Sequence, residues 1–194
     1  LISLSCFLWF FLLSIPTGML MNRIGRKKTV LLSFALHVAA MIVPLAAYDF
    51  TAVLIAFALI GIGNTLLQVS LNPLVTNVIA GDKLTLGQFV KAVSSFLGPI
   101  IAAAVTGSIL GWKMIFPIYA AISLLALVWL WLTPIAEQKV ASADISIGHT
   151  FSLLKDKYIV AFFIGILVLV GVDVGMGITF PKLLMERCNL PLTD

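Results

Sequence analysis

The sequence predicts an all-α membrane protein, a polytopic bundle with about six transmembrane helices. Three observations lead to this class: 61% of the 194 residues are hydrophobic, only 10% are charged, and the apolar residues form long unbroken runs. Soluble domains carry about 25% charged and about 45–50% apolar residues, so this chain lacks the polar surface of a water-soluble fold. A transmembrane β-barrel is excluded because the apolar runs are continuous and do not alternate with polar residues.

Six apolar runs meet or approach the roughly 20 residues that a helix needs to cross the hydrocarbon core of a bilayer. In chain order they cover residues 2–21, 29–48, 52–79, 85–109, 113–134 and 158–180. The first run ends at a basic turn, residues 22–28, and the second ends at Asp49. The third and fourth end at short polar connections around Gly81 and Gly111. Such short connections force consecutive helices to run antiparallel as neighbours.

The fifth run is followed by a longer polar stretch, which we interpret as a linker between two bundles. Its charged and titratable residues are Glu137, Lys139, Asp144, His149, Lys155, Asp156 and Lys157. The predicted division is residues 1–134 as part of an N-terminal transmembrane bundle, 135–157 as the linker, and 158–194 as the first helix of a C-terminal bundle with the start of the following loop. Because the chain opens inside an apolar run and stops soon after its last one, we expect a fragment of a longer protein.

The distribution of Lys and Arg predicts which loops face the cytoplasm. The net charge of +4 does not indicate nucleic-acid binding, because these residues lie between apolar runs, where they act as orientation signals. If the basic turn from Arg23 to Lys28 is cytoplasmic and the helices alternate, the cytoplasmic loops hold eight Lys and Arg and the outer loops hold three. Loops 22–28, 81–84 and 135–157 are therefore predicted to be cytoplasmic.

The third run contains the densest set of polar side chains. Asn64, Gln68 and Asn72 recur every four residues, which places them on one stripe that drifts slowly around a helix. Amides offer both donors and acceptors, as a site for a hydroxyl-rich solute requires. The alternative is that they hydrogen-bond neighbouring helices. Gly61 and Gly63 in the same run allow close approach of another helix.

Two charged residues lie inside apolar runs. Asp173, in the sixth run, is suited to carrying a proton or helping to bind sodium, or it pairs with a base. Lys91, in the fourth run, either extends along the helix toward the headgroups or presents a fixed positive charge to a cavity beside Gln68. His37 is expected to be a hydrogen-bonded packing residue, and His149 has no predicted partner. The sequence contains no Ser/His/Asp set, phosphate loop or metal cluster, so we expect no catalysis, no metal and no cofactor.

Residues 18–28 resemble the signature of the major facilitator superfamily, glycine-x-leucine-x-acid-arginine-x-glycine-arginine-basic-basic. The matching residues are Gly18, Leu20, Arg23, Gly25, Arg26, Lys27 and Lys28. The resemblance implies a cytoplasmic loop between helices two and three of twelve, in agreement with the orientation predicted from charge. Asn22 stands where the family usually has an acid, which removes a charge thought to latch the two halves of the protein together.

A narrower resemblance covers nearly the whole chain. Residues 15–18, 41–47, 71–73 and 170–175 are similar to the fucose/galactose/glucose symporter branch of this superfamily. In that branch a carboxylate four residues before an Asn-Pro pair serves sugar binding and proton coupling, whereas this chain has Gln68, which does not titrate. A glutamine linked to sugar binding in the branch falls at Lys91. The resemblance leaves Asp173 as the local candidate for the ion-coupled group.

The resemblance implies that the six runs are helices two to seven of twelve. The implied function is a secondary active, cation-coupled symporter that moves a small polar solute, a monosaccharide, by alternating access in a bacterial plasma membrane. Asn64, Gln68, Asn72 and Lys91 would bind the solute, and Asp173 would respond to the coupling ion, H⁺ or Na⁺. The expected partners are the solute and membrane lipid, with a monomeric full-length protein. The alternatives are a multidrug exporter of the same superfamily and a nontransporting receptor or scaffold.

Overall fold

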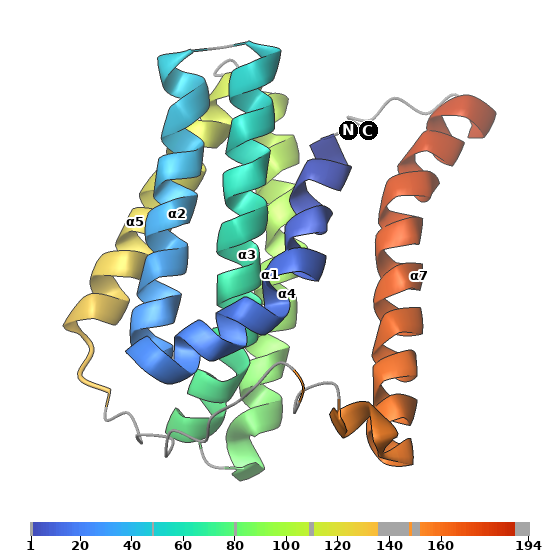
Figure 1. Ribbon diagram of the computed structural model, residues 1–194. Helices are drawn as coiled ribbons and strands as arrows, with labels where there is room; N and C mark the ends of the chain where they lie inside the picture. The colour runs from blue at the N-terminus through green and yellow to red at the C-terminus, as the bar shows by residue number, and fades with distance from the viewer. Residues whose placement is uncertain are drawn as a thin grey trace. The chain divides into compact units, whose positions relative to one another are not determined.

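The computed structural model describes residues 2–47, 49–79, 81–108, 111–135, 148 and 152–188. Six long helices make up most of this part of the chain: α1 (Ile2–Ile24), α2 (Arg26–Ala46), α3 (Phe50–Val78), α4 (Leu84–Thr106), α5 (Ile115–Leu132) and α7 (Lys157–Cys188) (Figure 1). Short 3-10 turns precede three of them, namely η1 (Gly81–Lys83), η2 (Trp112–Met114) and η3 (Leu153–Lys155). The all-α fold predicted from the apolar runs is confirmed.

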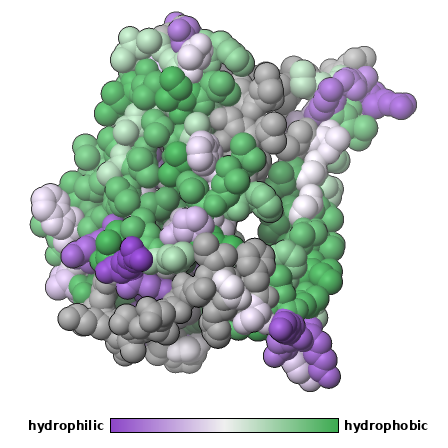
Figure 2. Space-filling model, in the orientation of Figure 1, coloured by the Kyte–Doolittle hydropathy of each residue, from purple (hydrophilic) through white to green (hydrophobic). Residues whose placement is uncertain are grey.

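Most of these helices are suited to crossing a bilayer. Five segments are long and apolar enough to do so: Arg26–Ala46, Phe50–Val78, Leu84–Thr106, Trp112–Leu132 and Lys157–Arg187. The apolar segment Leu8–Ile24 of α1 is shorter. Large apolar side chains point outward, with Phe11 86% and Trp129 79% exposed, and hydrophobic surface covers the lengths of the helices (Figure 2). Lipid, rather than water, is the solvent that such a surface requires, so the chain is a multi-pass membrane protein.

The turn between α1 and α2 is much shorter than predicted. Residues 22–24 and 26–28, expected in a loop, continue the two helices, and only Gly25 interrupts them. The N–H of Gly25 donates to the carbonyl oxygen of Met21 at 2.9 Å, and the N–H of Thr29 donates to the Gly25 oxygen at 3.2 Å. Gly25 has φ 97° and ψ 156°, a region that is essentially restricted to glycine. A single residue therefore reverses the chain.

The last helix is longer than its apolar run. The predicted segment ended at residue 180, whereas α7 continues to Cys188. Lys182 and Glu186 lie one turn apart on this extension, with 3.9 Å between Nζ and Oε1. Polar residues continue a helix readily once it has left the hydrocarbon, so hydropathy marks the span but not the end of the helix.

The chain divides into two compact units, Leu1–Ala143 and Asp144–Asp194. In the first unit α3 packs against both α1 and α2, and α2 also packs against α5. Most of the buried side chains of this unit are small, and Val30, Leu66, Leu74 and Pro44 are the larger ones. The small ones are Ala40, Ala52, Ala56, Thr17, Thr29, Ser33, Thr65 and Ser70. Small residues let membrane helices approach closely and gain packing energy where no hydrophobic drive exists between them.

Several of the buried hydroxyls bond within their own helix. Thr29 Oγ1 donates to the Gly25 oxygen, Ser33 Oγ to the Val30 oxygen and Thr65 Oγ1 to the Gly61 oxygen, all at 2.8 Å. The hydroxyls at these three positions are therefore satisfied, whereas the buried hydroxyl of Ser70 on α3 has no hydrogen-bond partner among the described residues. Shape complementarity, more than hydrogen bonding, holds the two helices together here.

The second unit contains η3 and α7. The carboxylate of Asp156 accepts a hydrogen bond of 2.8 Å from the N–H of Tyr158 and so satisfies one free donor at the start of α7. The predicted linker, residues 135–157, is described only at residues 135, 148 and 152–157. Glu137, Lys139, Asp144 and His149 lie outside the described residues, and the division into bundle, linker and following helix stays a prediction.

Candidate functional site

The basic turn ties together one end of the first unit. Arg26 Nη1 donates to the carbonyl oxygen of Pro73 on α3 at 3.1 Å. Lys27 Nζ donates to the oxygens of Trp131 and Thr133, at the end of α5, at 3.1 and 2.7 Å. Carbonyls at a helix C-terminus carry partial negative charge, which a cation stabilises. Two adjacent cations at the start of α2 thus form hydrogen bonds with neighbouring helices, Arg26 with α3 and Lys27 with the end of α5.

The other residues of the predicted motif lie near the end of α1, close to these hydrogen bonds. Asn22 is half-buried in the last turn of α1 and Arg23 is exposed beside it. Gly18 lies one turn earlier, and a Cβ added there would meet nothing within 4 Å. The structure therefore gives a conformational reason for glycine at position 25 but not at position 18.

The first amide of the predicted stripe lies between α2 and α3. Asn64 is half-buried, and its Oδ1 lies 3.0 Å from Nε2 of His37. The other ring nitrogen, Nδ1, lies 2.7 Å from the carbonyl oxygen of Ser33. Because a carbonyl oxygen only accepts, Nδ1 carries a proton. Nε2 meets the side-chain amide of Asn64, so the two ring nitrogens contact one group on α2 and one on α3.

Gly63 makes room for this histidine. A Cβ at position 63 would lie 2.8 Å from Cε1 and 2.9 Å from Nδ1 of His37, which is closer than real contacts allow. The expectation that glycine permits close helix approach therefore applies at this residue. His37 was expected to be a hydrogen-bonded packing residue, and its contacts agree with that expectation. Its position relative to Gly63 and Asn64 was not predictable because they lie on another helix.

The second amide faces a different helix. Gln68 is exposed within the unit, and its Oε1 accepts a hydrogen bond of 3.0 Å from Nζ of Lys91 on α4. Lys91 is half-buried. Of the two placements considered for this lysine, the one beside Gln68 agrees with the geometry. Asn72, the third amide, is exposed on α3 one turn further on.

Asp173 lies in the middle of α7, in the second unit. Its side chain is exposed within that unit. Added Cβ atoms at the neighbouring Gly171, Gly175 and Gly177 would meet nothing within 4 Å, so the space beside these glycines is open. The structure brings Lys91 to Gln68 and His37 to Asn64, and it describes Asp173 separately from both pairs.

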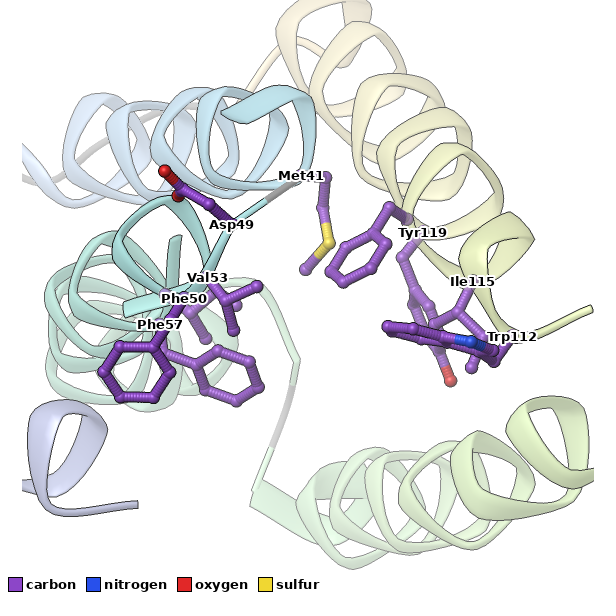
Figure 3. Close-up of a pocket in the computed structure, with 10 residues that line it drawn as sticks. Met41, Asp49, Phe50, Val53, Phe57, Trp112, Ile115 and Tyr119 are labelled. Carbon is purple, nitrogen blue, oxygen red and sulfur yellow. The ribbon is translucent and has the colours of Figure 1, made fainter. Parts of the chain in front are cut away.

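A pocket that the sequence did not suggest lies at the opposite end of the first unit from the basic turn. It encloses about 690 Å³ between α2, α3 and α5, and its lining is Met41, Asp49, Phe50, Val53, Phe57, Ile60, Trp112, Ile115, Phe116 and Tyr119 (Figure 3). Asp49 directs its carboxylate away from the aromatic rings, where Oδ1 accepts from the N–H of Ala52 at 2.6 Å. The pocket interior is therefore apolar. The sequence feature that could have indicated this pocket is the set of aromatic residues at positions 112, 116 and 119, which share one helical face.

Tyr119 connects this pocket to α4. Its hydroxyl donates to the carbonyl oxygen of Gly98 at 3.0 Å, while its ring lines the pocket. Among the described residues there is no group of three or more His, Cys, Asp or Glu placed to hold a metal ion. The side-chain hydrogen bonds described here between helices of the first unit are those of Lys91 with Gln68, His37 with Asn64, Tyr119 with Gly98, and Arg26 and Lys27 with carbonyl oxygens.

The fold and these contacts define a polytopic helical membrane protein with a few polar pairs between apolar helices. The sequence profile of the Major Facilitator Superfamily matches residues 1–193, and the chain belongs to this family. Glucose/galactose transporters of two Brucella abortus strains, biovar 1 strain 9-941 and strain 2308, are each 28% identical over 188 residues. The match covers 87% of this chain and 45% of each relative, so the chain spans about half the length of these curated relatives. No solved structure matches.

Proposed function

We propose that the protein containing this chain is a cation-coupled symporter that carries a monosaccharide across a bacterial plasma membrane by alternating access. The family and the likeness to glucose/galactose transporters support transport of a small polar solute. The single observation that carries the proposal is the pair Gln68–Lys91, two polar side chains joined between apolar helices. Polar groups at such positions are costly in lipid and are retained where they face a solute pathway.

The roles of the site residues follow from their chemistry. Gln68 and Lys91 contact the solute, with Asn64 and Asn72 on the same helix available to its hydroxyls. Asp173 is the ion-linked group for H⁺ or Na⁺, because it is the one carboxylate within the apolar part of α7. Coupling requires that ion and solute bias the same conformational equilibrium. The loops with most Lys and Arg face the cytoplasm. No catalytic step is proposed, in agreement with membership of a transporter family.

Replacing Gln68 tests the solute site. Gln68→Ala removes the acceptor for Lys91, and we expect uptake by the full-length protein in proteoliposomes to fall at least about tenfold, the factor that one hydrogen bond to a charged group is worth. Gln88→Ala is a matched control, because Gln88 is an exposed glutamine on the first turns of α4. Normal uptake by the Gln68 variant would contradict a role in solute binding and would mean that Gln68 only packs between helices.

The coupling ion is tested separately. Uptake of glucose and galactose is measured with the sodium gradient and the pH gradient varied one at a time. Symport predicts that one of the two gradients drives accumulation of sugar above its outside concentration. Equilibration that responds to neither gradient would contradict the coupled mechanism while leaving transport itself intact.

A second candidate, export of lipophilic solutes, is favoured by one observation. The apolar aromatic pocket of about 690 Å³ has the lining of a site for such molecules, which bind through buried area and ring contacts. Competition separates the two functions: an exporter binds lipophilic cations in preference to sugars, whereas a sugar symporter is displaced by sugars.

A further inference from the structure

We infer that the solute carries a negative charge, namely that it is a monosaccharide with a carboxylate group, held by Lys91. This inference rests on the proposed function and specifies its substrate class.

The long helices of the first unit carry basic but no acidic side chains. Over their full bounds α1, α2, α3, α4 and α5 contain no Asp or Glu. Their Lys and Arg side chains lie at the α1–α2 turn, where Arg26 and Lys27 bind carbonyl oxygens, with one exception. The exception is Lys91, well inside α4. The membrane-spanning part of the first unit therefore carries a positive charge that none of its own helices neutralises.

The ammonium group of Lys91 is held by a side chain of α3. A lysine near a membrane surface usually extends its chain toward the headgroups. Lys91 instead reaches across to α3, where Nζ lies 3.0 Å from Gln68 Oε1. It is half-buried, and no described carboxylate forms an ion pair with it. The lysine is thus held at one place by a neutral partner, which orients the charge without cancelling it.

The Lys91–Gln68 pair has more hydrogen-bond donors than acceptors. An ammonium has three donors and no acceptor, and one of its donors is used by Gln68. The Gln68 amide keeps one of the two lone pairs of its oxygen and both N–H donors of its nitrogen. On the next turn the hydroxyl of Ser94 donates to the Val90 oxygen and that of Ser95 to the Lys91 oxygen. The pair therefore offers donors to a solute and few acceptors.

A carboxylate is the complement of such a pair. It only accepts hydrogen bonds, and its bonds to a cation are shorter and stronger than those between neutral groups. A neutral sugar hydroxyl can also accept from this pair, but it presents one neutral oxygen where a carboxylate presents two that share a negative charge. A sugar acid presents the carboxylate to this pair and leaves its hydroxyls for other amides.

The test compares sugars that differ in one group. Binding and uptake of glucuronate and galacturonate are measured against glucose and galactose with the full-length protein in phosphatidylcholine vesicles, which lack anionic headgroups. We expect the acids to be preferred by at least about tenfold in kcat/KM, the value of one charge-assisted hydrogen bond. Lys91→Gln should abolish that preference and Lys91→Arg should preserve much of it. Lys83→Gln, at the exposed turn before α4, is the matched control and should change nothing.

Each other outcome has a defined meaning. Equal or better transport of the neutral sugars by the natural protein overturns the inference and leaves the proposed sugar transport standing. Transport of neither kind overturns both. If Lys91→Gln is inactive but a double variant with Asp173→Asn recovers neutral-sugar uptake, Lys91 is paired within the protein and the inference is wrong. The comparison of acids with neutral sugars in the natural protein does not depend on whether the variants fold.

Discussion

The contact between α2 and α3 narrows at Gly63, where the ring of His37 lies against the backbone. A Cβ at position 63 would lie under 3.0 Å from two atoms of the ring, so glycine leaves the space that the imidazole occupies. The Asn64 amide and the Ser33 carbonyl then fix both ring nitrogens. One glycine therefore determines whether His37 reaches its two partners.

Gly63→Ala tests this arrangement. The added methyl would lie under 3.0 Å from the ring and 3.3 Å from the Ser33 oxygen, so the helices must separate or the ring must leave. We expect a loss of about 1–3 kcal/mol, the usual cost of overpacking a well-packed contact, seen as a lower melting temperature in detergent. Gly18→Ala is the control, since its Cβ meets nothing within 4 Å. Equal melting temperatures for both variants would contradict the contact.

At the scale of whole elements, the helices were predictable and their ends were not. Apolar runs identified all six long helices because lipid leaves a spanning segment no alternative to internal hydrogen bonding. The basic turn was expected to be a loop from its charges, yet Arg26, Lys27 and Lys28 are good helix formers and begin α2. α1 is bent in Figure 1, and it contains Pro16, a residue that removes one helical hydrogen bond and commonly causes such a bend.

The candidate site was predictable in composition, and of its two pairs only Lys91 beside Gln68 was among the placements considered. Asn64, Gln68 and Lys91 stood out because polar groups are rare in these runs. Their partners lie on other helices, 27 residues away for His37–Asn64 and 23 for Gln68–Lys91. No periodicity within one helix specifies such contacts, because they depend on how neighbouring helices are rotated. The aromatic pocket escaped notice for the same reason.

Gly25→Ala tests the reversal between α1 and α2. A side chain at φ 97° and ψ 156° is strained by about 1–3 kcal/mol. The strain is relieved only by moving α2, which would pull Arg26 and Lys27 from the carbonyls that they bind. We expect a lower melting temperature and reduced uptake in the same variant. A variant as stable as the natural protein would mean that the turn has another accessible conformation.

At the scale of the molecule, the basic side chains gather at one end of the first unit. Arg23, Arg26, Lys27 and Lys28 lie at the α1–α2 turn, where hydrophilic surface appears in Figure 2, and Lys83 follows α3 at its C-terminal end. The link from Lys27 to the end of α5 places a third helix terminus there. Lys113 lies at the start of α5, at the other end.

Cysteine labelling tests the orientation. Lys28→Cys and Lys113→Cys are made in a full-length protein without its native cysteines, and both positions are exposed. With a membrane-impermeant maleimide on intact cells, we expect labelling at position 113 at once and at position 28 only after the membrane is permeabilised, because basic loops stay in the cytoplasm. The reverse pattern would invert the topology.

The hydrogen bonds of Arg26 and Lys27 have a mechanical consequence. They join α2, α3 and α5 at one rim, while the same three helices enclose an apolar hollow at the opposite rim. Atoms that border empty space lose part of their dispersion attraction, so a displacement there meets less resistance than one at a close-packed contact. We therefore expect these three helices to resist displacement more at the rim with the cations than at the rim with the rings.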